Sequence, residues 1–140
     1  MRIRLLLIAA FLTAAIILGF PSLQNHFGYI NPKQNYTQDE IVELSERAEK
    51  GDSRAVKRLY LYYASVNYSP KNMEKWLLIG AKQKNIDSMY ALAFFYISEN
   101  APKKDVKKAQ FWADELANYD QKKAVQIREE INRLNQENID

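Results

Sequence analysis

An internal repeat of small and aromatic residues is the feature that most constrains the fold of this chain. The run Ala48-x2-Gly51-x3-Ala55-x3-Leu59-x3-Tyr63 recurs 33 residues later as Ala81, Lys84, Ser88, Leu92 and Tyr96. The run Met73-x2-Trp76-x4-Ala81 recurs 36 residues later as Ala109, Trp112 and Ala117. Such periods are typical of chains built from stacked units, none of which buries its apolar face alone. We therefore expect paired helices that approach closely at small residues and enclose Leu, Tyr and Trp between pairs.

Six segments of the chain after Tyr36 have apolar residues at helical spacing, and each begins with a residue that caps helices well. Thr37 to Glu40 forms a capping box, and Pro70 follows Ser69 at the first helical position, where no N–H is needed. Gly51 supplies a left-handed exit from the first helix. The predicted starting residues are Thr37, Ser53, Ser69, Asp87, Asp105 and Asp120. No segment predicts a strand convincingly, so we expect an all-α solenoid of about three helical hairpins.

The N-terminal 23 residues have the pattern of a membrane-directed leader. Two arginines precede Leu5 to Phe20, a run in which only Thr13 is polar. As a helix extended to Leu23, the run rises roughly 28 Å, close to the roughly 30 Å hydrocarbon thickness of a bilayer. Positive charge on its N-terminal side alone places the N-terminus in the cytoplasm. A single-pass transmembrane helix or a cleaved signal peptide are the two alternatives.

Either form of the leader exports the rest of the chain. Residues 24–36 are polar, contain Gly28 and Pro32, and predict a linker, and residues 37–140 predict the helical domain. We expect an inner-membrane protein with its C-terminal domain in the periplasm, or a periplasmic protein if the leader is cleaved. His26, the single histidine, lies in the linker, where a catalytic or ligating role is not expected.

Charge and composition exclude several classes of function. The chain has 20 basic and 17 acidic residues, and all 17 acidic residues follow Tyr36, where 17 basic residues balance them. The domain therefore lacks the net positive charge that drives non-specific binding to nucleic acid. No cysteine is present, which removes disulfides and thiolate metal sites. No phosphate loop, metal-ligand spacing or nucleophile constellation appears, so we expect neither an enzyme nor a cofactor.

The run W-x4-A-x2-G-x3-A-x3-L-x3-Y, best seen from Trp76 to Tyr96, resembles the Sel-one-like repeat, a relative of the tetratricopeptide repeat. The resemblance covers roughly Thr37 to Leu134 and implies an α-solenoid that acts as an interaction scaffold. Lys84 and Asp120 stand where the family turn prefers Gly, and Arg128 stands where Leu is expected. The third hairpin is therefore expected to be a capping pair with a polar outer face.

A partner-binding surface is expected on the first helices of the second and third hairpins. Trp76 and Trp112 occupy equivalent positions and are expected in the core, which leaves the opposite helical face to a partner. The candidate residues on that face are Lys75, Leu78, Lys82, Phe111 and Asp114. Ordinary solvated positions are the alternative. Residues 54–108 carry a net charge of +7 between acidic flanks, which would steer an acidic partner.

Two functions follow from the resemblance and the leader together. The more specific is an immunity or inhibitor protein that binds an exported effector toxin in the periplasm. The alternative is a structural adaptor that organises or regulates a bacterial envelope complex. Both are protein–protein interaction modules and neither is an enzyme.

Overall fold

The computed structural model describes residues 35–99 and 101–137, and these contain six α-helices and no β-strand. The helices are α3 (Gln38–Glu49), α4 (Ser53–Ser65), α5 (Pro70–Lys82), α6 (Ile86–Ile97), α7 (Val106–Ala117) and α8 (Gln121–Glu137). The prediction of an all-α fold is thus confirmed for this part of the chain. The predicted leader, and the linker up to Gln34, lie outside the described residues. None of the helices described is long and apolar enough to span a bilayer.

Four of the six predicted helix starts are confirmed by side chains that accept hydrogen bonds from free backbone N–H groups. In the capping box, Thr37 Oγ1 accepts from Glu40 N at 3.2 Å and Glu40 Oε2 accepts from Thr37 N at 2.8 Å. Ser69, Asp105 and Asp120 accept from Asn72 N, Lys108 N and Lys123 N at 3.0–3.4 Å. These caps explain why each helix begins where it does.

Two predicted starts are wrong. The cap of α4 is Asp52 rather than Ser53, because its Oδ1 accepts from both Arg54 N and Ala55 N, at 2.9 and 3.1 Å. The cap of α6 is Asn85 rather than Asp87, with Oδ1 accepting from Ser88 N at 2.8 Å. In both hairpins the link between helices is only three residues long, so the residue after the left-handed position is already the cap.

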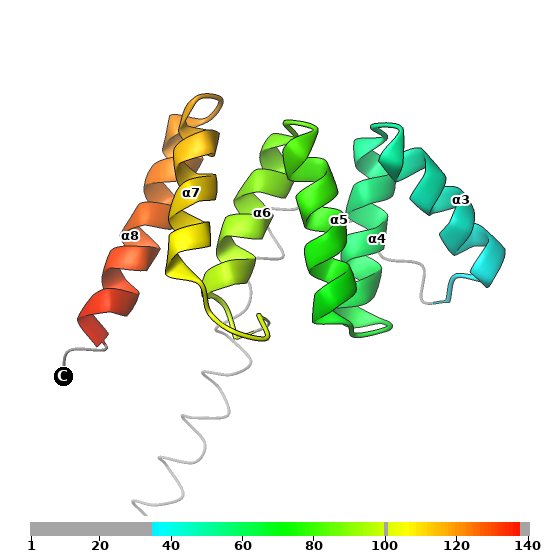
Figure 1. The fold of residues 1–140 in the computed structure, drawn as a ribbon, viewed down its shortest axis with the longest axis horizontal. Helices are drawn as coiled ribbons and strands as arrows, with labels where there is room; N and C mark the ends of the chain where they lie inside the picture. Colours follow the sequence, from blue (N-terminus) through cyan, green and yellow to red (C-terminus); the bar gives the residue numbers. More distant parts are fainter. Residues whose placement is uncertain (1–34, 100, 138–140) are drawn as a thin grey trace, which may run out of the picture. The chain divides into compact units, whose positions relative to one another are not determined.

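The helices pack in two layers. Each helix contacts its neighbours in the chain, and in addition α3 contacts α5 while α6 contacts α8. The first helices of the hairpins (α3, α5, α7) therefore form one layer and the second helices the other (Figure 1). The core runs between the layers, and α6 contributes the largest share of it, with nine of its twelve residues buried. Leu59, Leu77, Leu92 and Leu116 are fully excluded from solvent.

Close approach of paired helices at small residues is confirmed between α5 and α6. A Cβ added at Gly80 would contact the hydroxyl oxygen of Ser88, and it would lie 2.7 Å from Ser88 Cβ and 2.9 Å from Val56 Cγ1. Distances below 3.0 Å are shorter than real Cβ contacts, so no larger residue fits without movement of the helices. Ser88, which replaces the alanine of the repeat, is itself 3% exposed.

Hydrogen bonds between successive hairpins join residues that are a nearly constant number of positions apart in the sequence. Separations of 35 or 36 residues recur in Gln83 Nε2 to Ala48 O (2.9 Å), Lys84 Nζ to Tyr119 OH (2.9 Å), Lys123 Nζ to Asp87 Oδ1 (3.0 Å) and Tyr90 OH to Gln126 Oε1 (3.3 Å). Each bond connects a residue of the second hairpin with a residue of the hairpin before it or after it. The second hairpin thus contacts both others in a common register.

The links within the first two hairpins turn through a left-handed residue. The predicted left-handed exit at Gly51 is confirmed by its φ of 97°, and Lys84 occupies the same position in the next hairpin with φ 62°. In each turn a backbone N–H reaches the carbonyl five residues earlier: Asp52 N to Arg47 O and Asn85 N to Gly80 O, both at 3.0 Å. In the third hairpin, Asp120 N instead bonds Leu116 O at 2.8 Å, so this turn differs from the other two.

Replacing Lys84 with glycine is expected to raise the free energy of unfolding by about 1 kcal/mol, because a side chain in the left-handed region costs roughly 1–2 kcal/mol. The gain is partly offset because the bond from Lys84 Nζ to Tyr119 OH is lost. Lys84→Ala is the matched control: it loses the same bond and keeps the strained backbone, so it is expected to destabilise slightly. Urea unfolding of both variants checks this, and equal stabilities for them would contradict it.

Candidate protein-binding surface

The five residues predicted to bind a partner lie on the two first helices α5 and α7, which share one layer of the fold (Figure 1). Lys75, Lys82, Phe111 and Asp114 are exposed, and Leu78 is half-buried. We refer to the set Lys75, Leu78, Lys82, Phe111 and Asp114 as the first-helix face. All five side chains are at least partly exposed to solvent.

Phe111 is the largest apolar group on this face, with 55% of its surface exposed. Its ring packs edge-on against Trp112, with centroids 5.2 Å apart. The expectation that both tryptophans are core residues is confirmed for Trp76, which is 3% exposed, and only in part for Trp112, which is half-buried. The difference follows from packing, because α5 has a described hairpin on each side and α7 has one on only one side.

The lysines of α5 carry positive charge that the described residues do not balance. Lys75 and Lys82 belong to the first-helix face, and Lys71 lies one helical turn before Lys75. No ion pair joins any of the three to another of the described residues. The Lys75 ammonium lies 4.5 Å from the centroid of the Trp76 ring, a cation–π contact. The outer side of α5 is therefore a positive surface.

Asp114 differs from the other residues of the face because its charge is already compensated. Arg128 Nη2 on α8 lies 2.7 Å from Asp114 Oδ1, and Gln110 Nε2 donates to the same oxygen at 2.8 Å. The hydrogen bond from Arg128 lowers the pKa of Asp114. Arg128 occupies the position where the repeat would have leucine, so the departure from the repeat is explained by this pair between α7 and α8.

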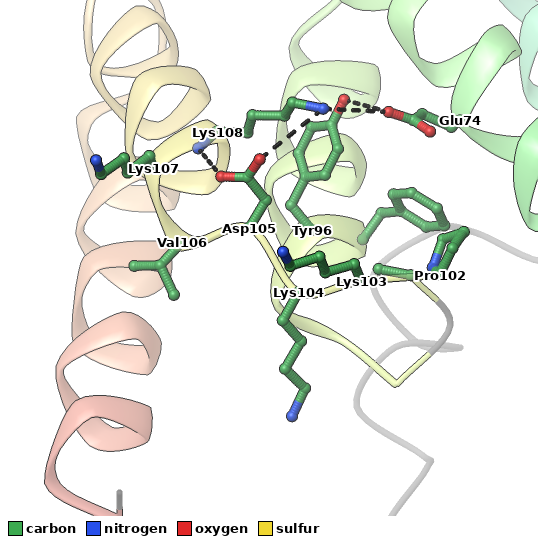
Figure 2. A pocket seen from close by; sticks show the side chains of 11 residues that line it. Glu74, Tyr96, Pro102, Lys103, Lys104, Asp105, Val106, Lys107 and Lys108 are labelled. Atoms are coloured by element: carbon green, nitrogen blue, oxygen red, sulfur yellow. Dashed lines mark hydrogen bonds and ion pairs between the residues drawn. The ribbon is translucent and has the colours of Figure 1, made fainter.

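A pocket of about 490 Å³ lies where α5, α6 and the start of α7 meet, beside the link from Ser98 to Asp105 (Figure 2). The sequence pattern did not predict this pocket. The signal available was the link itself, which is eight residues long against three in the hairpin turns. The lining residues are Glu74, Phe95, Tyr96, Ala101, Pro102, Lys103, Lys104, Asp105, Val106, Lys107 and Lys108.

Two carboxylates of the pocket are held by neighbours within the domain. Tyr96 OH donates to Glu74 Oε1 at 2.7 Å. Lys108 Nζ lies 3.8 Å from Glu74 Oε1 and 3.9 Å from Asp105 Oδ2, and 4.9 Å from the centroid of the Tyr96 ring (Figure 2). Burial and the carboxylate of Glu74 raise the pKa of Tyr96, so the phenol stays protonated and remains a donor. Lys108 thus contacts both acids and balances one of their two negative charges.

The first-helix face and the pocket present charged and apolar side chains. Within residues 35–99 and 101–137, no group of three or more His, Asp or Glu side chains is placed to hold a metal ion. The adjacent pairs Asp114–Glu115 and Glu129–Glu130 diverge around their helices and do not converge on one atom. No protein-family model, curated protein or solved structure matches this chain.

Proposed function

We propose that the protein is a protein–protein interaction module built as a short α-solenoid of the Sel-one-like type. The hydrogen bonds between hairpins at separations of 35 and 36 residues support a repeat of that length. The left-handed turns at Gly51 and Lys84, 33 residues apart, also support repetition, because they occupy the same place in two hairpins. Stacked repeats present a continuous outer surface of first helices, and such surfaces serve to bind other proteins.

The observation that carries this proposal is the exposure of Phe111 on the same layer as the unbalanced lysines of α5. An aromatic ring 55% exposed buries a large apolar area when a partner covers it. Lysines without an acidic neighbour attract a complementary partner and raise the rate of association. Aromatic groups surrounded by polar residues are typical of the centre of protein interfaces.

The most specific form of the proposal is an immunity or inhibitor protein that binds an exported effector toxin in the periplasm. Its support is the basic and apolar pattern of residues 1–23, which predicts export, together with the binding face of the domain. A structural adaptor that organises an envelope complex is the alternative and uses the same face. The two differ in what deletion does: toxin sensitivity in the first case, and loss of an assembled complex in the second.

Changing the first-helix face is expected to weaken partner capture. We expect Phe111→Ala combined with Lys75→Glu to reduce recovery of the partner at least about tenfold, since hot-spot residues contribute about 2 kcal/mol or more each. The measurement is affinity purification of the tagged full chain from its own cells, with quantitative mass spectrometry. Lys50→Glu combined with Lys122→Glu is the control, because both are exposed lysines beside the hairpin turns and neither belongs to the first-helix face.

A protein recovered equally with the wild type, the face variant and the control would contradict the proposed face. For the specific form, co-expression with the toxin of a neighbouring gene tests protection directly. Wild type and control are expected to restore growth, and the face variant is expected not to. Sensitivity to the toxin that is the same with and without the wild-type protein would rule out the immunity role.

A further inference from the structure

The pocket adjoins one end of the first-helix face. Glu74 in its wall is the chain neighbour of Lys75, and Lys107 lies one helical turn before Phe111 on α7. Both α5 and α7 begin at this end of the fold (Figure 1). A partner segment that lies along the first-helix face therefore reaches the pocket without leaving the surface.

The pocket has an apolar wall of adequate size for a side chain. Phe95, only 2% exposed, lines it from α6, and Pro102 and the 36% exposed Val106 line it from the link and the start of α7. Its volume of about 490 Å³ is within the range of roughly 300–1,000 Å³ found for ligand pockets. It is large enough for one large apolar side chain with its flanking backbone.

Around this wall, positive charge is in excess. Four lysines line the pocket against the two carboxylates of Glu74 and Asp105. Lys108 lies near both acids, and Lys104 pairs with Glu99 at 2.5 Å. No ion pair joins Lys103 or Lys107 to any other described residue. Figure 2 shows Lys103 between Asp105 and Pro102, whereas the side chain of Lys107 points away from Tyr96. Lys103 thus adds charge at the pocket, and Lys107 adds charge on the side of α7 away from Tyr96.

We infer that the pocket binds an acidic segment of the partner protein through one large apolar side chain. That side chain packs against Phe95, Pro102 and Val106, and a carboxylate beside it approaches Lys103. A second carboxylate, where the segment continues over α7 toward Phe111, approaches Lys107. The inference rests on the proposed function and adds the chemistry of the partner. A protein segment fits better than a nucleic acid, because the pocket wall is partly apolar and residues 37–140 have no net charge.

A short peptide tests the inference without knowledge of the partner. The probe is a fluorescein-labelled peptide of four glutamates around one central phenylalanine, titrated with the full chain in dodecylmaltoside and followed by fluorescence anisotropy. Lys103→Glu combined with Lys107→Glu is expected to weaken binding about tenfold, and about 300 mM salt is expected to weaken binding to the wild type several-fold relative to about 50 mM. Lys50→Glu combined with Lys122→Glu, with the same change in charge, is expected to bind as the wild type does.

Two altered peptides separate the apolar and the acidic parts of the inference. Glycine in place of phenylalanine, and lysine in place of the glutamates, are each expected to abolish measurable binding. Binding that is unchanged by either replacement, or by the Lys103 and Lys107 substitutions, would overturn the inference. So would tighter binding of phosphatidylglycerol vesicles or single-stranded DNA than of the probe. A partner captured through Phe111 and Lys75 while the probe fails to bind would leave the proposed function standing and reject this pocket.

Discussion

Trp76→Ala is expected to lower the free energy of unfolding by about 3–5 kcal/mol, whereas Trp112→Ala is expected to lower it by only about 1–2 kcal/mol. The two tryptophans occupy the same position in successive hairpins, so the pair separates burial from residue type. Trp76 is 3% exposed, and its removal leaves a cavity between α5 and its neighbours. Trp112 is half-buried, so part of its side chain is already in contact with solvent and less buried apolar area is lost when alanine replaces it.

Urea unfolding followed by far-ultraviolet circular dichroism measures both losses. Since small domains have about 5–15 kcal/mol of stability in total, Trp76→Ala is expected to bring the domain close to unfolding at room temperature. Trp76→Phe keeps part of the buried ring and is expected to recover a portion of the loss, which guards against a variant that does not fold. Equal losses at the two positions would show that burial does not distinguish them.

Gly80→Ala is expected to destabilise the domain by about 2–3 kcal/mol, although alanine is favoured over glycine in a helix by about 1 kcal/mol. The added methyl group would contact Ser88 Oγ and would lie 2.7 Å from Ser88 Cβ and 2.9 Å from Val56 Cγ1. Helices α5 and α6 must then separate, and contacts between buried side chains are lost. The sign of the effect is the test, because helix propensity alone predicts stabilisation.

A double-mutant cycle identifies the contact responsible. Ser88→Gly removes the two nearest obstructing atoms, so Gly80→Ala is expected to cost about 1–2 kcal/mol less in that background than in the wild type. Thermal unfolding of the four proteins measures the coupling. If the cost of Gly80→Ala is the same with and without Ser88, the close approach at this point does not determine the packing of α5 on α6.

Local signals in the sequence predict the helices well, because capping depends on residues within one turn. Thr37, Ser69, Asp105 and Asp120 each accept a hydrogen bond from the amide three residues ahead, and such contacts can be inferred from spacing alone. The errors at Ser53 and Asp87 have the same local origin. In each case a second capping residue, Asp52 or Asn85, precedes the predicted one, and the three-residue turn selects the earlier.

The candidate surface is only partly predictable for a different reason. The helical spacing of Lys75, Leu78 and Phe111 places them away from the core, and the structure agrees. Whether a charge on that face is available depends on residues far along the chain. The charge of Asp114 is compensated by Arg128, fourteen residues further along the chain. By contrast, no described residue forms an ion pair with Lys75 or Lys82.

The sequence alone determined the six described helices, the left-handed turn at Gly51 and most of the division between inner and outer positions, because spacing and capping act over a few residues. Only the tertiary structure decided three other features: the deeper burial of Trp76 compared with Trp112, the contact of Gly80 with Ser88, and the pocket beside Tyr96. Each of these depends on distances between separate helices. Such distances follow from how all the side chains of the interior pack together, and local spacing does not specify them.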